Sequence, residues 1–271
     1  MKGDLRRALF RGRHRPRLIG VGSPTAIRGD GYEFAELREY VAGDDPRRID
    51  WAATARAGAL QTRVVLEDVA LTLAAVVDDS PSMRLGRDRP LFQAAREAVQ
   101  AWYGAALTDD RCMRVTAAGL YAPHGLRGPR SALACANAPT TRPFELRAAL
   151  EIARAALPAG AALLVISDFL DVDTLTDVLL LRLGTRFDCT ALIARDPWFE
   201  SLPLRGFVVL GDAETESQRR LYIGPKERQR YREAVRRRED QLCARLDRSG
   251  WRTGILHEVD GERSLFAAFG L

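Results

Sequence analysis

Acidic and hydroxyl side chains follow two of the most apolar runs in the sequence. Asp78, Ser80 and Ser82 alternate in the stretch DDSPSM, directly after the run LTLAAVV, and Asp168 comes directly after the run ALLVIS. Carboxylate and hydroxyl oxygens are ligands that suit Mg²⁺, Mn²⁺ and Ca²⁺, whereas zinc is more often bound through nitrogen and sulfur. If both runs are strands, this spacing indicates a cation site shared by two strand ends.

The same residues also have an ordinary structural interpretation. Asp and Ser after a strand commonly form helix caps and Asx-turns, and the D-x-S-x-S spacing often occurs by chance. Because Asp168 is a second acid at a strand end, we give the metal site and the cap or turn equal weight, and both interpretations stay open. Two carboxylates and two neutral hydroxyls would leave a divalent cation short of charge and of ligands. Such an ion would attract a carboxylate from another molecule, which favours docking over catalysis.

Residue sets for other kinds of catalysis are missing from the sequence. The three histidines, His14, His124 and His257, are dispersed, and no P-loop or G-x-G-x-x-G motif is present. The enzymatic alternative is a metal-dependent phosphoester hydrolase with Asp78 and Asp168 as ligands. It would have to recruit the neighbouring acids Asp79 and Asp171.

The elements that must position these residues alternate between strands and helices from residue 71 onward. Strands are predicted at 71–77, 112–118, 162–167 and 187–194, with further candidates at 204–210 and 251–258. Helices are predicted at 90–107, 144–157, near 172–183 and at 225–249, the last with an apolar stripe of Tyr231, Val235, Leu242 and Leu246. This alternation predicts an α/β fold with a mostly parallel open sheet. Ligands of such sheets bind beyond the carboxyl ends of strands, where the strand order reverses.

Composition narrows the class of protein further. Hydrophobic residues make up 46% of the chain and charged residues 28%, enough to form a sizeable core. No run approaches the roughly 20 apolar residues of a membrane span, and the start has no apolar signal core, so we predict a cytoplasmic protein. Cys112, Cys135, Cys189 and Cys243 are scattered without a C-x-x-C pair, which predicts free thiols.

The positive charge is concentrated at the N-terminus. The net charge is +5, and residues 1–17 hold seven basic side chains and one acid, so the remainder is close to neutral. This basic N-terminal arm (1–28) could bind RNA, DNA or an anionic membrane surface. It lacks interleaved aromatic residues, so we favour a solvated, partly ordered segment and do not expect a nucleic-acid partner.

A denser pattern lies upstream of the first acid loop, in RGDGYEFAELREYVAGDDPRRIDWAATARAGALQTR (28–63). This block resembles the signature of the conserved bacterial family 58 of unknown function, and DDSPSM resembles the metal-ion-dependent adhesion site of von Willebrand factor A-like domains. Together with ISDF, ARDPWFESLP and GDAET, the resemblance covers roughly residues 28–260. The matching positions in the block are Gly29, Gly31, Glu33, Phe34, Leu37, Arg38, Tyr40, Gly43, Asp44, Arg47, Ile49, Asp50, Trp51, Ala55 and Arg56.

The resemblance implies a Rossmann-like A-type domain at 71–271, with the signature segment 29–70 packed on it as an N-terminal extension. It implies Mg²⁺, or Mn²⁺ or Ca²⁺, held by Asp78, Ser80, Ser82 and Asp168. It also implies a non-enzymatic adaptor that works with a MoxR-type AAA+ ATPase in the maturation or remodelling of a client complex, the client presenting an exposed carboxylate. One departure is Phe144, which stands where A-type domains usually have a threonine, so the site is expected to be incomplete. Thr140 and Thr141 lie a few residues earlier.

The signature segment can also be interpreted from its residues. Positions 33–40 are expected to form a short helical or turn segment, and positions 43–46 a turn. Trp51 with Ile49 is expected to anchor the segment on the A-type domain. The charged members are expected to form pairs, and the segment would then serve either as an internal clasp or as a recognition surface for the ATPase. The residues concerned are Glu33, Arg38, Tyr40, Asp44, Asp45, Arg47, Asp50, Trp51 and Arg56.

Overall fold

The computed structural model of the chain divides into two compact units. One unit comprises residues 1–13 and 71–271, and the other comprises residues 14–70. The described residues are 2–13, 28–41, 44–66, 71–106, 110–121, 142–170, 172–195, 198, 204–211 and 218–271.

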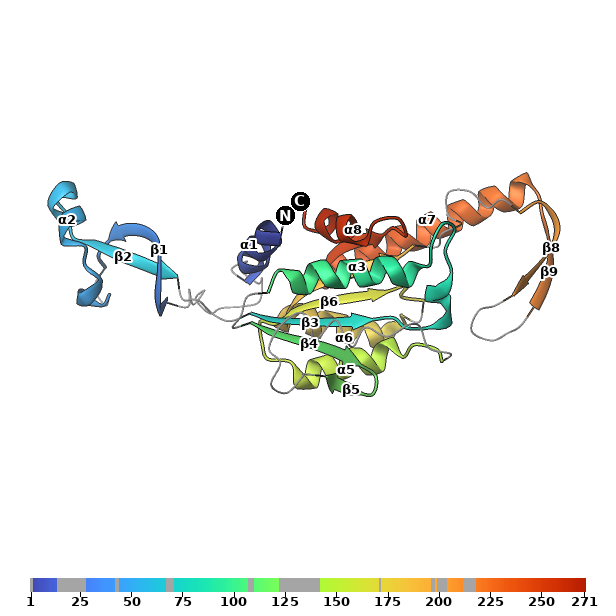
Figure 1. Cartoon of the computed structure of the whole chain (residues 1–271), viewed down its shortest axis with the longest axis horizontal. Coiled ribbons are helices and arrows are strands. Elements are labelled where there is room, and N and C mark those ends of the chain that lie inside the picture. The colour runs from blue at the N-terminus through green and yellow to red at the C-terminus, as the bar shows by residue number, and fades with distance from the viewer. Residues whose placement is uncertain are drawn as a thin grey trace. The chain divides into compact units, whose positions relative to one another are not determined.

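A six-stranded sheet forms the centre of the larger unit, in the order β10-β7-β6-β3-β4-β5. All neighbouring strands run parallel except the short edge strand β5, which is antiparallel to β4. The predicted α/β class and mostly parallel open sheet are therefore confirmed (Figure 1). The strands are β3 (Thr72–Val77), β4 (Arg111–Thr116), β5 (Gly119–Tyr121), β6 (Ala162–Ser167), β7 (Asp188–Ala194) and β10 (Arg252–Leu256).

Helices cover both faces of this sheet and produce two hydrophobic cores. Strand β6 contributes to both cores, because successive side chains of a strand point to opposite faces of the sheet. Leu164 and Ile166 belong to one core, and Leu163 and Val165 belong to the other. The first core is closed by α1 (Lys2–Arg13), α3 (Leu91–Gly104) and α8 (Gly261–Ala268). The second is closed by α5 (Leu146–Ala156), α6 (Thr174–Arg186) and the C-terminal part of α7 (Pro225–Arg248).

The N-terminal segment is not a solvated arm over the residues that the structure describes. Residues 2–13 form helix α1, which contacts α3 and β7 and buries Leu5 and Leu9 completely. Arg6, on the same helix, forms an ion pair with the buried Asp110. The expectation of a solvated segment is therefore wrong for this part, because a spacing of four residues places both leucines on one helix face. The rest of the predicted arm, 14–27, lies outside the described residues.

The smaller unit is built on two antiparallel strands, β1 (Arg28–Glu39) and β2 (Gln61–Leu66). The short 3₁₀ segment η1 (Pro46–Arg48) and helix α2 (Trp51–Ala57) lie between them in the chain. The prediction of a helical or turn segment at 33–40 is therefore wrong, because most of these residues belong to strand β1. The register shifts between Phe34 and Glu36. A bulge of this kind breaks the alternation by which a strand is recognised.

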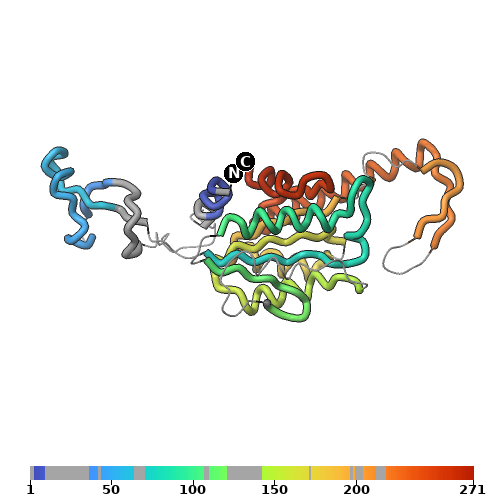
Figure 2. Tube along the Cα trace, in the orientation of Figure 1, coloured from blue at the N-terminus to red at the C-terminus, as the bar shows by residue number. Residues whose placement is uncertain are grey.

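A second two-stranded sheet extends from the larger unit. Strands β8 (Gly206–Gly211) and β9 (Gln218–Ile223) pair only with each other among the described strands, so the candidate strand at 204–210 exists but lies outside the main sheet. Helix α7 follows β9, and of its predicted stripe Leu242 and Leu246 are buried, whereas Tyr231 and Val235 are half-buried. In Figures 1 and 2 the hairpin and the start of α7 lie beyond the end of the sheet. Among the described helices, none has the length and apolar character of a membrane span.

The contact between α3 and α8 depends on the absence of a side chain at Gly261. A Cβ placed there would lie 1.8 Å from the carbonyl oxygen of Ala94. We therefore expect Gly261→Ala to lower the free energy of unfolding by about 1–3 kcal/mol, the usual cost of overpacking, because α8 must move away from α3. Urea denaturation measures this change. The matched control is Gly3→Ala on α1, where no atom lies within 4 Å, and this variant should be close to neutral.

Candidate metal centre

The two predicted strand-end acids lie side by side at the point where the strand order reverses. Strands β3 and β6 are parallel neighbours, with Val77 opposite Ile166, so Asp78 and Asp168 leave the same edge of the sheet. From β3 the chain passes to β4 and β5 on one side and to β6, β7 and β10 on the other. This reversal opens a crevice beyond the strand ends, which is the usual ligand position in open α/β sheets.

Asp78 is held at the base of this crevice by three hydrogen bonds. Its N–H donates to the carbonyl of Ile166 (2.8 Å), its Oδ1 accepts from the N–H of Ser80 (2.9 Å), and its Oδ2 accepts from the hydroxyl of Ser167 (2.9 Å). Asp78, Ser80 and Ser167 are all buried. The hydroxyls of Ser80 and Ser82 are 2.7 Å apart and hydrogen-bonded. Burial of so many polar groups requires partners for each of them, and here they partner one another.

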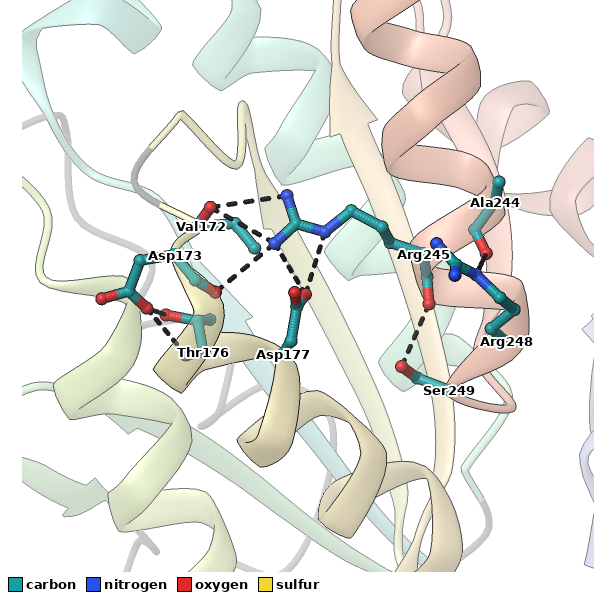
Figure 3. Close-up of polar contacts among 8 residues, drawn as sticks. All are labelled: Val172, Asp173, Thr176, Asp177, Ala244, Arg245, Arg248 and Ser249. Atoms are coloured by element: carbon teal, nitrogen blue, oxygen red, sulfur yellow. Dashed lines mark hydrogen bonds and ion pairs between the residues drawn. The ribbon is translucent and has the colours of Figure 1, made fainter.

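Asp168 begins the loop that joins β6 to α6, and helix α7 braces that loop. The Oδ1 of Asp168 accepts from the N–H of Leu170 (2.9 Å), and its carbonyl accepts from the guanidinium of Arg238 (2.8 Å). Further along the loop, Arg245 donates to the carbonyl of Val172 and pairs with the carboxylate of Asp177 at 2.7 Å (Figure 3). Two arginines of α7 thus fix the loop that carries the second acid.

These groups surround a small pocket of about 90 Å³. The sequence-predicted residues Asp78, Ser80 and Asp168 line it. Ser82 is not in the lining, but its hydroxyl lies 2.7 Å from that of Ser80. The full lining is Asp78, Ser80, Phe144, Leu146, Ser167, Asp168 and Leu170.

The structure adds Ser167 as a polar residue of the pocket that sequence reasoning missed. The available signal was a hydroxyl at the end of an otherwise apolar strand, directly before Asp168. This signal was not sufficient, because side chains alternate along a strand and the sequence does not show to which side the last one points.

The oxygen atoms available as ligands in this pocket suit a hard divalent cation. The pocket offers carboxylate and hydroxyl oxygens, which suit Mg²⁺ and its relatives. Each carboxylate oxygen has two lone pairs, so one that accepts a hydrogen bond from the loop can still face an ion. Asp78, Ser80 and Asp168 would hold the ion, with Ser82 orienting the hydroxyl of Ser80. Mg²⁺ takes about six oxygen ligands, so water or a partner's carboxylate would have to complete this set.

Phe144 lies in the lining of this pocket, as its alignment with the usual threonine predicts. Its ring supplies no ligand, so the apolar part of the rim is formed by Phe144, Leu146 and Leu170. Thr140 and Thr141 lie outside the described residues.

The described part of the chain does not assemble a cluster of acids for a two-metal site. It contains no group of three or more His, Cys, Asp or Glu side chains that could hold an ion. Asp79 does not line the pocket. Burial raises the pKa of its carboxyl, the charge of Arg114 opposes this shift, and the charge of Asp78 adds a smaller contribution to it. Asp171 lies outside the described residues.

Some predicted pairs in the smaller unit form and others are replaced. Arg38 contacts the buried carboxylate of Asp44 at 2.6 Å, as expected. Asp45 accepts a hydrogen bond from the backbone N–H of Arg47 at the start of η1. The salt-bridge partner of Asp50 is Arg63, and Asp50 also caps α2 through the N–H of Ala53.

Trp51 lies at the first position of α2 and exposes 69% of its surface, so it is not packed inside the smaller unit. Its role as an anchor on the A-type domain stays a prediction. Arg56 lies in the last turn of that helix and is also exposed, while Tyr40 is half-buried. The side chain of Glu33 and residue Gly43 lie outside the described part of the structure.

Cys112 is expected to be chemically inert in the folded protein. Burial, with a smaller contribution from the nearby charge of Asp110, raises the pKa of its thiol to about 12. Thiolate is the reactive form, so the thiol stays protonated through neutral pH. We predict that iodoacetamide at pH 8 leaves Cys112 unmodified in the native protein and alkylates it in urea, as read by peptide mass spectrometry. Equal labelling in both states would contradict this assignment.

The strand order and the acid loop together define the class of this protein. Numbered in chain order within the sheet, the strands lie as 3-2-1-4-5-6 with an antiparallel edge strand, and a D-x-S-x-S loop opens at the switch point. This is a Rossmann-like domain of the von Willebrand A type. The chain belongs to the family described as Protein of unknown function DUF58, whose model matches residues 36–241.

Uncharacterized relatives occur in mycobacteria. Proteins of Mycobacterium bovis and Mycobacterium tuberculosis are 31% identical over 211 residues, which cover 73% of this chain and 66% of theirs. The chain thus spans about two thirds of the length of these relatives.

Three solved structures are also similar. An aerotolerance-related membrane protein of Bacteroides fragilis has a TM-score of 0.44 at 11% identity, covering 73% of this chain and 96% of that one. BatB of Bacteroides thetaiotaomicron has a TM-score of 0.43 at 12% identity, covering 74% and 98%. A von Willebrand factor type A protein of Catenulispora acidiphila has a TM-score of 0.41 at 13% identity, covering 78% and 43%.

Proposed function

We propose that the protein is a non-enzymatic adaptor that binds a carboxylate of a client protein through Mg²⁺ at the strand-end pocket. Asp78, Ser80 and Asp168 hold the ion in this proposal, and Ser82 positions Ser80. The fold and the family suggest an adaptor-type role. The metal, the client and a MoxR-type AAA+ ATPase as the second partner belong to the proposal, as does a cytoplasmic location.

The observation that carries the proposal is the convergence of Asp78, Ser80 and Asp168 on one pocket at the switch point. Two carboxylates share this small space with the hydroxyls of Ser80 and Ser167. Like charges held close together repel, and a divalent cation would remove that repulsion. Hydroxyl ligands add no charge, so the bound ion would remain attractive to an external carboxylate.

The same composition favours docking over hydrolysis. A hydrolase at this site would need a base to activate water or a second metal to hold the leaving oxygen. The lining offers three apolar side chains, Phe144, Leu146 and Leu170, and two serines in addition to the acids. A single cation surrounded by these apolar side chains could bind the carboxylate of a partner, while the side chains next to that carboxylate pack against Phe144, Leu146 and Leu170.

The client part of the proposal can be tested with a fluorescent peptide that presents one aspartate among small apolar residues. The peptide should bind with Mg²⁺ present and lose binding with EDTA, in Ser80→Ala, or when its aspartate is replaced by asparagine. If none of these changes alters binding, the metal-docking proposal is wrong. Hydrolysis of p-nitrophenyl phosphate with Mg²⁺, abolished in Asp78→Ala, would instead establish an enzyme.

The ATPase part needs a separate experiment. The full-length chain is immobilised, and binding of the MoxR-type ATPase encoded in the same genome is measured by biolayer interferometry. We expect binding that persists in Ser80→Ala, because the metal pocket is reserved for the client. The two partners would then occupy different surfaces, and absence of binding by the ATPase would contradict this part alone.

A further inference from the structure

The β8–β9 hairpin carries an exposed apolar face. Phe207 and Tyr222 are cross-strand partners with ring centroids 5.3 Å apart, and they expose 73% and 58% of their surfaces. Val209 lies on the same face, two residues along β8, and is 59% exposed. Opposite it, Arg220 places its guanidinium 5.6 Å from the centre of the Phe207 ring. Two aromatic rings, an aliphatic side chain and an arginine therefore form one continuous face.

Among the described strands, the two strands of this hairpin pair only with each other. A two-stranded sheet is marginally stable in water unless another element covers it. Ile223, at the base of β9 next to α7, is buried, but Leu210 and Leu221 on the opposite face are also exposed. Contiguous exposed apolar side chains of this kind mark interaction sites on folded proteins.

The segment that continues from the hairpin is strongly basic. Residues 218–238 contain nine arginine or lysine side chains and two glutamates, a net charge of +7. Both glutamates are engaged locally, Glu227 with the N–H of Gly224 and Glu233 with the side chain of Gln229. The buried residues of α7 are Leu242 and Leu246, near its other end, and the basic side chains of 225–238 are exposed except for the half-buried Arg228. We call residues 206–211 and 218–238 the hairpin–α7 extension.

The chemistry of the extension selects among possible occupants. Counted over 206–238, with the acids Asp212, Glu214 and Glu216 included, the net charge is +4, so a second copy of the chain would bring two positive surfaces together and self-association is opposed by repulsion. Nucleic acid would use the arginines and aromatic rings but would leave the aliphatic side chains Val209, Leu210 and Leu221 without a partner. Insertion of the hairpin into an anionic membrane is opposed by Asp212, Glu214 and Glu216, which join its two strands. Phe, Tyr and Arg are the residues enriched at the centre of protein interfaces.

We propose that the hairpin–α7 extension docks an acidic protein segment that also carries apolar side chains. The apolar side chains of that segment cover Phe207, Val209 and Tyr222, and its carboxylates face Arg220 and the arginines of α7. None of the residues that line the metal pocket belongs to this surface. The docked segment would contact no metal ligand, so we expect it to bind without Mg²⁺, and the proposal does not depend on the adaptor function of the pocket.

The test uses the full-length chain and a short fluorescein-labelled peptide in which glutamate and leucine alternate, with fluorescence anisotropy as the readout. We expect binding that weakens as salt rises and that falls at least about tenfold in Phe207→Ser/Tyr222→Ser and in Arg220→Glu. EDTA and Ser80→Ala should leave it unchanged, which separates this surface from the pocket. The double variant is checked by circular dichroism, and Arg220→Glu, which keeps Phe207, Val209 and Tyr222 in place, provides an independent measurement.

Matched controls make the result specific. Leu175→Ser/Val178→Ser removes two exposed apolar side chains from α6 and should leave the affinity for the peptide unchanged. Equal loss in this control, or no binding of the acidic peptide at all, overturns the proposal. Binding of oligothymidine or phosphatidylglycerol vesicles in its place, lost in Arg220→Glu, would overturn it in favour of nucleic acid or membrane. A dimer in sedimentation that requires Phe207 and Tyr222 would overturn it in favour of self-association.

Discussion

Replacing Arg6 by alanine should destabilise the larger unit by about 3–5 kcal/mol. The guanidinium of Arg6 pairs with Asp110, whose side chain is 1% exposed and also accepts a 2.6 Å hydrogen bond from the N–H of Leu71. Removal of Arg6 takes away a cationic partner of this buried carboxylate. The free energy of unfolding, measured by urea denaturation at neutral pH, reports the loss.

The control for this prediction lies one residue further along the same helix. The side chain of Arg7 is 80% exposed and is 3.8 Å from Asp4, also at the surface. Exposed ion pairs contribute about 0–1 kcal/mol, so Arg7→Ala should be nearly neutral. Equal effects of the two variants would show that the N-terminal helix contributes nothing specific to the fold. The double variant Arg6→Met/Asp110→Leu should recover part of the loss, because no uncompensated charge remains.

The second large effect is expected in metal binding. If Mg²⁺ or Mn²⁺ binds the pocket, a concentration of 100 times the dissociation constant stabilises the native state by about 2.7 kcal/mol. In a protein of this size that raises the melting temperature by about 5–10 °C. Asp78→Asn and Asp168→Ala should abolish the increase, since each removes a charged ligand. Differential scanning calorimetry with and without the ion measures it.

Neighbouring residues supply the controls for metal binding. Asp79→Asn changes the adjacent acid, which does not line the pocket, and should retain the full increase. Ser80→Ala should weaken metal binding more than Ser82→Ala, because only Ser80 lines the pocket. A melting temperature that rises with Mg²⁺ equally in wild type, Asp78→Asn and Asp168→Ala would place the ion elsewhere on the protein.

Two arginines of α7 brace the β6–α6 loop. Arg238, at the end of the basic segment, donates to the carbonyl of Asp168, while Arg245, further along α7, holds Val172 and Asp177 (Figure 3). The helix that carries the basic extension therefore also fixes the backbone that presents the second acid.

Most of the larger unit was predictable from the sequence because its signals are local. The apolar runs of β3 and β6 identify strands buried on both faces, and the helical periodicity of 90–107 places α3 to within a few residues. Asp78 and Asp168 could be predicted because each directly follows such a strand, and Ser80 because it alternates with Asp78 in the same loop. The resemblance of 28–63 and DDSPSM to the family signature then indicated the strand-end arrangement.

What the sequence missed depends on contacts between distant residues. The strand β1 is defined by its pairing with β2 and is obscured by a bulge, and helix α1 is defined by the pocket that receives Leu5 and Leu9. The separation of β8 from the main sheet follows from its pairing with β9.

The composition of the pocket also follows from packing across the sheet edge, which admits Ser167 and Phe144 and leaves Ser82 outside. The sequence by itself therefore determined which strands end in acids. Only the tertiary structure decided which side chains share the space between those ends, because strand order and loop packing are set by non-local contacts that no local pattern records.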